Sequence, residues 1–478
     1  MIDRVVLLDL GTTRLKGWRV EGGEVTAALS ERAPELRSEG DRVESDAAGY
    51  LLAAVRLLER LIVSDGRESL LGLAVQRSSF LVWEAETARP LTPLISWQDT
   101  RAQDWIAQRR SGSRFGRESE EWLRSVTGLL LSPHYFAPKL RTVLDENPDL
   151  EERLVSGTAR VGTLDTAFLN HIAGGEVFVT GSSVAGRTLL ADLKSGEWNG
   201  WLREWFGLER IPLARILPDA GEIVRLREGL SCGAIVGDQA AAYLALWDVD
   251  EPPVLVNIGT GAFTLAPLRN AEIGKEISRE GTVLRGSRDR YLRSLVRWKR
   301  NGGEERLLMQ EGTVNGTGNR LEEFRVVEEA WPERDPAPDG FCIPDRGMIG
   351  APWWCPAPVD PFQGEYKEAD RPRLIREGIV FRLAEQIEEI AENAETIFLS
   401  GGGIADPLIP SGLAALFPEK TFRLLDDPEA TLRGLARIVQ ISRGGPRLSA
   451  PKWREVEGAG AEWLREKYGR WKEMRTSV

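Results

Sequence analysis

The sequence predicts an α/β protein built from two similar lobes that face one cleft. The main observation is an internal repeat, in which a short apolar run ends in a polar residue and a glycine turn. Residues 6–13 read VLLDLGTT, and residues 254–261 read VLVNIGTG. Each copy is typical of a buried strand that bends into a hairpin. A chain of 478 residues is also too long for one compact core, which favours two or three domains.

The spacing of apolar residues predicts the elements of the first lobe. Residues 5–8 predict a strand, residues 50–61 a helix and residues 70–75 a further strand. The Pro-containing segment 248–253 lies just before the second copy of the repeat, so we place an interlobe hinge there. This division predicts three parts, namely a first lobe over 1–248, a second lobe over 249–445 and a helical tail over 446–478.

The second lobe is expected to contain two irregular regions. Residues 285–303 are charged and contain glycine, so we interpret them as a surface insertion, and residues 331–364 are rich in Pro and Gly. Residues 374–391 have apolar positions on one helical face. The strand-like residues 397–399 and a glycine turn at 400–403 follow. A charged helix in the tail, with Trp463 to Trp471, is expected to dock on this lobe.

Composition excludes several classes of protein. The net charge of -11 argues against a nucleic-acid partner held by general electrostatics. Cys232, Cys342 and Cys355 are too far apart for a C-x-x-C site, so neither a disulfide framework nor a zinc site is predicted. No apolar stretch approaches the ~20 residues of a membrane span. We therefore expect a cytoplasmic protein without a membrane partner.

Phosphoryl transfer requires a phosphate cradle, a divalent ion and a carboxylate base. The sequence has no G-x-x-x-x-G-K-[ST] loop, so the paired turns are the candidate cradle. Their glycines allow backbone N–H groups to approach phosphates, threonines add hydroxyls, Asp9 suits a water-mediated Mg²⁺ contact and Lys16 can meet a phosphate. An ordinary structural hairpin is the alternative. The candidate cradle residues are Gly11, Thr12, Thr13, Gly259, Thr260 and Gly261.

Asp238 is the candidate general base. It follows the apolar run that ends at Val236, and three alanines after Gln239 begin a predicted helix. A carboxylate at this position can accept the proton of a substrate hydroxyl. On the local sequence alone, the role of a helix N-cap is favoured, and only the context of the other motifs can decide between the two.

These segments together resemble the carbohydrate kinases of the FGGY type, which are relatives of actin and hexokinase. The resemblance covers about residues 5–440 and is greatest to the glycerol kinases within that family. Nine motifs occur in the order typical of the family. They are Asp9-Leu10-Gly11-Thr12-Thr13, Gln76-Arg77, Trp97-Gln98-Asp99-Thr100-Arg101, Thr127-Gly128-Leu129, Gly162-Thr163-Leu164-Asp165-Thr166, Gly237-Asp238-Gln239, Gly259-Thr260-Gly261, Gly350-Ala351-Pro352-Trp353 and Gly401-Gly402-Gly403.

The resemblance implies a fold of two actin-like (ribonuclease H-like) lobes with the active site in the cleft between them. It implies ATP and Mg²⁺ as cofactors, a small polyol or sugar as substrate, and a dimer or tetramer. Asp238 is implied to be the general base, with Asp9 and Asp238 near the magnesium ion.

The resemblance also implies which residues bind substrate and nucleotide. Arg77 and Gln239 match positions that contact substrate hydroxyls, while Trp97 and Phe263 match aromatic residues that cover the carbon backbone; plain core aromatics are the alternative. For adenosine, the matching positions are Gly318, Gly401, Gly402, Gly403 and Asp406. Asp406 stands where the glycerol kinase pattern has an asparagine, and a glycine-rich loop leading into a helix is the alternative for this region.

Two departures from the glycerol kinase pattern affect the substrate site. Ser78 follows Arg77 where that pattern has glutamate, and His134 stands where it has tyrosine. Both positions are candidate substrate contacts, although His134 can also be a structural histidine, as we expect for His171. Loss of the glutamate removes an acceptor for a substrate hydroxyl.

Three hypotheses follow from these departures. The first is a kinase of a polyol or sugar other than glycerol, such as a tetritol or a pentulose. The second is a glycerol kinase with altered contacts. The third is a pseudokinase that binds nucleotide or sugar as a regulator. The residues that perform transfer are all present, so we favour a kinase.

Overall fold

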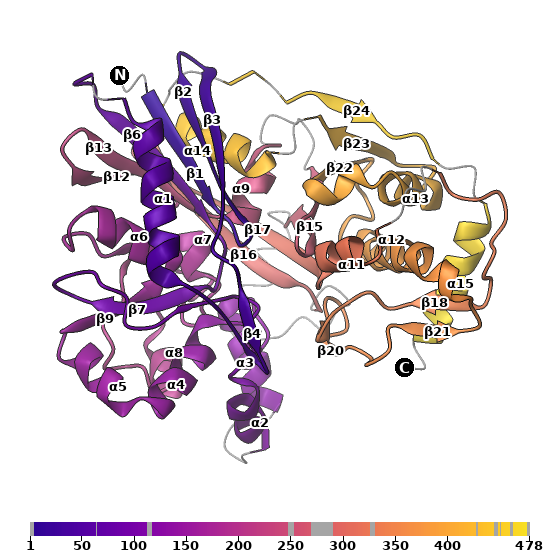
Figure 1. The fold of residues 1–478 in the computed structure, drawn as a ribbon, viewed down its shortest axis with the longest axis horizontal. Helices are drawn as coiled ribbons and strands as arrows, with labels where there is room; N and C mark the ends of the chain where they lie inside the picture. The colour runs from indigo at the N-terminus through magenta and orange to yellow at the C-terminus, as the bar shows by residue number, and fades with distance from the viewer. Residues whose placement is uncertain are drawn as a thin grey trace.

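A computed structural model describes residues 4–63, 65–111, 117–246, 253–268, 290–325, 330–426, 429–443, 448–449, 451–458 and 462–475. Its central feature is one sheet of thirteen strands that runs through both halves of the chain (Figure 1). The predicted hinge at residues 248–253 lies outside the described residues except for Pro253. Among the described helices, none is long and apolar enough to cross a membrane.

The same five-stranded unit occurs once in each half of the chain. The first unit consists of β1 (Arg4–Leu10), β2 (Arg14–Glu21), β3 (Glu24–Arg32), β6 (Ser69–Val75) and β13 (Leu230–Gly237). The second consists of β14 (Val254–Ile258), β15 (Ala262–Pro267), β17 (Gly303–Val314), β22 (Thr396–Ser400) and β23 (Thr421–Leu425).

The two units share strand order and direction. In the first, β2 and β3 continue antiparallel from β1, while β6 and β13 pair parallel on its other side. In the second, β15 and β17 continue antiparallel from β14, while β22 and β23 pair parallel on its other side. The α/β prediction is confirmed, and the short repeat in the sequence marks a repeat of the whole unit.

The units meet at β12 (Ala220–Arg227) and β16 (Leu292–Arg300), which join β13 to β17 within the sheet. Our expectation of a surface insertion at residues 285–303 is therefore wrong for residues 292–298, residues 299–303 are exposed at the end of the hairpin, and residues 285–289 lie outside the described part. Val296 and Trp298 are buried in the sheet. Arg297 is buried as well, and its guanidinium donates to the Ser195 carbonyl at 2.8 Å and to Glu197 at 3.3 Å. Paired charges can occupy a buried strand, which charge density alone does not reveal.

Helices cover the sheet and form its main cores. Helix α1 (Ala47–Leu61) packs on the first unit and α12 (Arg371–Ile390) on the second, as the apolar spacing predicts. Helix α9 (Asp238–Leu244) follows β13 and lies against α14 (Ala430–Arg443), which returns from the second half to pack on β1 and β6 (Figure 1). The two halves are thus joined by a helix pair as well as by the sheet.

A smaller five-stranded sheet extends the N-terminal half. Its strands are β4 (Arg37–Glu39), β5 (Arg42–Ser45), β7 (Phe80–Glu84), β8 (Leu94–Ile95) and β9 (Ala159–Thr163). An apolar core that includes the edge-to-face pair Phe80 and Phe136, 4.9 Å apart, lies between it and the nearby helices. The other elements of this half are α2 (Gln103–Ser111), α3 (Arg117–Thr127), α4 (Phe136–Glu146), α5 (Pro148–Val155), α6 (Leu164–Ile172), β10 (Val179–Gly181), α7 (Ser182–Ala185), α8 (Gly200–Trp205) and β11 (Arg215–Leu217).

The C-terminal half contains the irregular region expected at residues 331–364. Only short strands occur there, namely β18 (Gly340–Cys342), β19 (Met348–Ile349), β20 (Cys355–Pro356) and β21 (Phe362–Gly364). Among the described residues, the remaining elements of this half are α11 (Thr317–Glu323), the 3₁₀ turns η2 (Glu368–Asp370) and η3 (Gly402–Ala405), and α13 (Leu408–Leu416).

The tail consists of a strand and a helix. Strand β24 (Trp453–Glu455) pairs with β23 at the edge of the sheet. Helix α15 (Trp463–Arg475) places Leu464, Tyr468 and Trp471 in the core of the second unit. The predicted docking of this helix is confirmed.

Candidate active site

A cavity of about 370 Å³ is lined by residues from both halves of the chain. It brings together most of the predicted site residues, which come from the ends of β1, β6, β13 and β14 and from the smaller sheet. The predicted residues in its wall are Asp9, Gly11, Thr12, Thr13, Lys16, Arg77, Ser78, Trp97, His134, Asp238, Gln239, Gly259, Thr260, Gly261 and Phe263. Gly318, Gly401, Gly402, Gly403 and Asp406 are not part of the wall.

Asp238 is the first residue of α9, directly after β13, and Gly237 is the N-cap residue. Its Oδ1 accepts a hydrogen bond from the backbone N–H of Gln239 at 2.8 Å and lies 3.2 Å from Arg77 Nε. Its Oδ2 accepts from Gln239 Nε2 at 3.3 Å. Burial raises the pKa of Asp238, against the opposing charge of Arg77. The carboxylate is thus held rigidly in the cavity wall with lone pairs left for a ligand.

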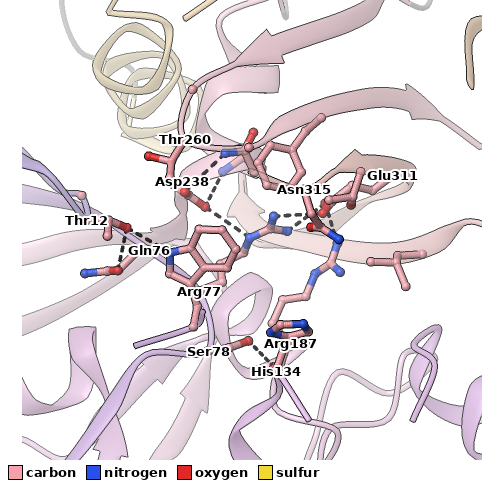
Figure 2. A pocket seen from close by; sticks show the side chains of 18 of the residues that line it. Thr12, Gln76, Arg77, Ser78, His134, Arg187, Asp238, Thr260, Glu311 and Asn315 are labelled. Atoms are coloured by element: carbon pink, nitrogen blue, oxygen red, sulfur yellow. Dashed lines mark hydrogen bonds and ion pairs between the residues drawn. The ribbon is translucent and has the colours of Figure 1, made fainter. Parts of the chain in front are cut away.

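Arg77 lies between two carboxylates, as Figure 2 shows. Besides Asp238, it contacts Glu311 of β17 through both terminal nitrogens, at 2.8 and 2.9 Å. Arg187, which follows α7, donates to the same carboxylate at 2.5 Å and to Ser294 Oγ at 2.6 Å. Burial opposes ionisation of Glu311, yet the two arginines hold its pKa below the usual value. These ion pairs join the two halves of the chain.

Asp9 is the last but one residue of β1 and lines the same cavity as Asp238. Burial, together with repulsion from Asp238, raises the pKa of Asp9 to about 7. Lys16 stands opposite Asp9 in the hairpin register, but its ammonium is bonded to Glu429 at 2.8 Å. Two half-buried carboxylates that repel each other fit a divalent cation, which relieves the repulsion.

The first turn is connected to Trp97 by hydrogen bonds. Thr12 Oγ1 accepts from the indole N–H of Trp97 at 2.9 Å and donates to Gln76 Oε1 at 2.9 Å. Gln76 donates to the Tyr50 hydroxyl, which in turn donates to the Gly11 carbonyl at 2.7 Å. Trp97 is therefore fixed in the cavity wall rather than buried in a core. Phe263 also lines the cavity, where its ring lies 5.8 Å from the guanidinium carbon of Arg77.

The second turn packs directly against the first turn of α11, which contains Gly318. The Gly318 N–H donates to the Thr260 carbonyl at 3.0 Å, and a Cβ at Gly318 would lie 2.6 Å from the Gly259 carbonyl oxygen. Asn257, the counterpart of Asp9, donates to Gln239 Oε1 at 2.9 Å and accepts from Ser400 Oγ at 3.0 Å. Gln239 thereby connects Asp238 to the second turn.

The glycine turn at residues 401–403 packs against Ile258, the residue just before the second turn. Gly401 has φ +88°, and a Cβ there would lie 2.4 Å from the Ile258 carbonyl oxygen. Both Asp406 oxygens already have partners, Arg376 Nε at 2.7 Å and the backbone N–H of Leu408 at 3.2 Å. No adenine contact is therefore built into Asp406 in this arrangement.

Ser78 and His134 line the cavity beyond Arg77. Ser78 has φ +64°, and its hydroxyl donates to the Arg187 carbonyl at 2.8 Å. Its own carbonyl accepts from the buried ammonium of Lys139 at 3.1 Å. Burial, together with the charge of Lys139, lowers the pKa of His134 to about 4, so its imidazole is neutral. His171, in contrast, is exposed on α6.

Several residues of the cavity wall are missing from the sequence-based set. Glu311 stands between Gln310 and Gly312 in a mixed stretch of β17, so nothing in the local sequence marks it as buried. Arg187 has no local signal either, because its partners Glu311 and Ser294 are distant in the sequence. The residues not predicted include Gln76, Tyr135, Arg187, Glu311, Thr313, Asn315 and Trp354.

Comparisons with known proteins place the chain among carbohydrate kinases. The description "FGGY family of carbohydrate kinases, N-terminal domain" matches residues 4–233. The glycerol kinase of Thermus brockianus is 31% identical over 406 residues, which cover 80% of this chain and 77% of that protein. The glycerol kinase of Alkalilimnicola ehrlichii is 27% identical and covers 94% of this chain and 92% of that protein.

Solved structures show the same fold. Plasmodium falciparum glycerol kinase with ADP has a TM-score of 0.74 at 17% identity, covering 100% of this chain and 98% of that one. Gluconate kinase from Lactobacillus acidophilus has a TM-score of 0.77 at 16% identity, covering 99% of this chain and 98% of that one. The expected two-lobed actin-like fold is confirmed. The chain therefore belongs to the FGGY family of carbohydrate kinases, which phosphorylate an alcohol group.

Proposed function

We propose that this kinase transfers the γ-phosphate of ATP, with Mg²⁺, to a hydroxyl of a small polyol or sugar other than glycerol. The observation that carries the proposal is the position of Asp238. Its carboxylate is held in a cavity wall shared by both halves, next to a guanidinium and within the same cavity as two glycine turns. This arrangement suits transfer between a nucleotide and a hydroxyl bound in one cleft.

Asp238 acts in this proposal as the general base. Arg77 and the backbone of Gln239 orient its carboxylate, which leaves an oxygen available for the proton of a substrate hydroxyl. Arg77 positions that hydroxyl, while Trp97 and Phe263 cover the carbon chain and exclude water.

The nucleotide and metal are assigned to the opposite part of the cavity. Asp9 and Asp238 would hold Mg²⁺, which neutralises phosphate charge when it is bound. The two turns, with Gly11, Thr12 and Thr13 and with Gly259, Thr260 and Gly261, offer backbone N–H groups to the phosphates. Adenosine is assigned to Gly318 and the turn at Gly401 to Gly403, with Asp406, which Arg376 holds, at the end of that turn.

The choice of substrate rests on Ser78. Its hydroxyl hydrogen is donated to the Arg187 carbonyl, and the oxygen that remains is a neutral acceptor, weaker than the carboxylate of the glycerol kinase pattern. The alternative of a glycerol kinase with altered contacts draws support from Glu311, which brings a carboxylate to Arg77 from the other half of the chain. The regulator alternative has no comparable observation in its favour.

The test is a coupled assay of ADP release over a panel of polyols and ketoses, with glycerol included. We expect turnover with a substrate of four or more carbons, and we expect Asp238→Asn to lower kcat by about 100- to 10,000-fold. Gln239 would still donate to the new amide oxygen, so the fold should persist. Full turnover by Asp238→Asn would exclude the base role, and a preference for glycerol would support the alternative.

Assembly and location are parts of the same proposal. We propose a dimer or tetramer in the cytoplasm, on the basis of the family and of cysteines that form no pair. Light scattering coupled to size exclusion measures the mass of the assembly directly.

A further inference from the structure

The part of the cavity beyond Asp238 contains two arginines whose charges are already matched. Arginine forks are typical binding sites for a carboxylate. Here Arg77 directs both terminal nitrogens at Glu311 and its Nε at Asp238, while Arg187 donates to Glu311 as well. The position that a substrate carboxylate would take between these guanidinium groups is therefore held by a carboxylate of the protein.

The charges of the two arginines are balanced, while the Lys139 ammonium lies behind Ser78 on the carbonyls of Ser78 and Ser96. Two guanidinium groups face two carboxylates, and the neighbouring His134 is neutral because its pKa is lowered to about 4. Glu311 is 1% exposed and Arg187 3% exposed, so the group is shielded from water. A substrate carboxylate would bring an unmatched negative charge into this environment, next to Glu311 and Asp238, which is costly.

Neutral hydroxyls meet no such penalty. A guanidinium has five N–H donors, and the contacts of Arg77 with Asp238 and Glu311 use three of them. The others can donate to substrate hydroxyls without displacing Glu311. The arrangement therefore favours the neutral hydroxyl groups of a substrate and disfavours a substrate that carries a negative charge.

We propose that Glu311 is a specificity-determining residue that restricts the site to uncharged polyols and sugars and excludes sugar acids. The proposal rests on the proposed function, since it takes this cavity as the substrate site. It identifies the class of substrate and the residue that selects this class. In Glu311→Gln, the side chain is a neutral amide. The two arginines then carry one positive charge without a matching negative charge, and a substrate carboxylate can neutralise it.

The experiment compares five-carbon compounds that differ in one group. ADP release is measured with pentitols, 2-ketopentoses and the corresponding pentonates, for the wild type and for Glu311→Gln. We expect kcat/KM of the wild type to favour the neutral compounds by about 100-fold. In Glu311→Gln we expect this ratio to fall by about tenfold or more, because the pentonates gain while the neutral compounds lose.

A matched control separates selection from general support of the fold. Glu377 is also 1% exposed and also has two cationic partners, Arg373 and Lys467, but it lies outside the cavity. Glu377→Gln should leave the ratio unchanged. If Glu311→Gln unfolds, calorimetric titration of the wild type with a pentitol and a pentonate gives the comparison instead, and equal affinities for the two compounds would overturn the inference.

The outcomes separate this inference from the function on which it rests. Wild-type turnover of pentonates that matches that of pentitols overturns the inference but leaves the kinase proposal intact. An equal loss for all compounds in Glu311→Gln also overturns it, because a structural role alone predicts that result. No turnover with any polyol or sugar overturns the proposed function.

Discussion

Lys139 of α4 lies on the substrate side of the cavity, and its titration makes the stability of the protein depend on pH. It is fully buried, and its ammonium donates to the carbonyls of Ser96 at 2.6 Å and Ser78 at 3.1 Å. Burial lowers the pKa of Lys139 to about 7. In the unfolded chain a lysine titrates near pH ~10.4. Between these values the unfolded chain binds more protons, so the free energy of unfolding should rise with pH.

The measurement is urea unfolding of the wild type and of Lys139→Met from pH 7 to pH 10. The lysine should contribute up to about 1.4 kcal/mol per pH unit in this window, and Lys139→Met should lack that contribution. The substitution also removes two hydrogen bonds, which shifts stability equally at every pH, so only the slopes are compared. Parallel curves for the two proteins would show that Lys139 does not titrate in this range.

For single residues, the sequence predicts which of them lie at the ends of strands. It does not predict the side chains that they contact. Asp9, Arg77 and Asp238 each follow a predicted strand, and the ends of neighbouring parallel strands meet at one edge of a sheet. The structure accordingly brings them to one cavity. Glu311 and Arg187 could not be assigned, because their importance depends on ion pairs formed across the whole chain.

Among the elements, the crossing of α9 and α14 places the base relative to the second half of the chain. Gly434 of α14 lies against the Ala241 carbonyl oxygen of α9, and a Cβ at Gly434 would lie 1.7 Å from that atom. Since Asp238 begins α9, any displacement of this helix moves the base. We expect Gly434→Ala to lower the free energy of unfolding by about 1 to 3 kcal/mol and to lower kcat as well.

Gly469 of α15 provides the matched control for the α14 substitution. It is also a helical glycine, but it is exposed, and an added Cβ would have no neighbour within 4 Å. Gly469→Ala should raise stability by about 0.5 to 1 kcal/mol, since alanine favours a helix over glycine. Denaturation midpoints and kcat of both variants are the measurements. Equal stability effects at the two positions would contradict the close crossing.

The sequence predicts those elements in which apolar residues recur at a regular spacing. Helices α1 and α12 have apolar faces that repeat at helical spacing, and both occur as expected. Strand β16 does not show a clear pattern, because Arg297 and Trp298 are buried side by side in it. Its position in the sheet depends on pairing with β17, and pairing between strands is not encoded in either strand alone.

For the whole molecule, the repeat at residues 6–13 and 254–261 is the most informative feature of the sequence. It marks two units with the same order of strands, and this symmetry predicts a cleft between them. The division into 1–248, 249–445 and 446–478 stays a proposal. Two contacts complicate it, since α14 packs on β1 and β6 of the first unit and α15 contributes to the core of the second.

The position of the cavity between the two units predicts that they close around their ligands. Transfer of a phosphoryl group to a sugar hydroxyl requires exclusion of water, and two-lobed enzymes achieve this by a change in the angle between lobes. The ion pairs of Arg77 and Arg187 with Glu311 join the units on one side of the cavity and so favour rotation over separation. We expect a non-hydrolysable ATP analogue with Mg²⁺ and a pentitol to reduce the radius of gyration in small-angle scattering, and neither ligand alone to give the full effect. An unchanged radius, with binding established by calorimetry, would show that the two units are already in their final arrangement.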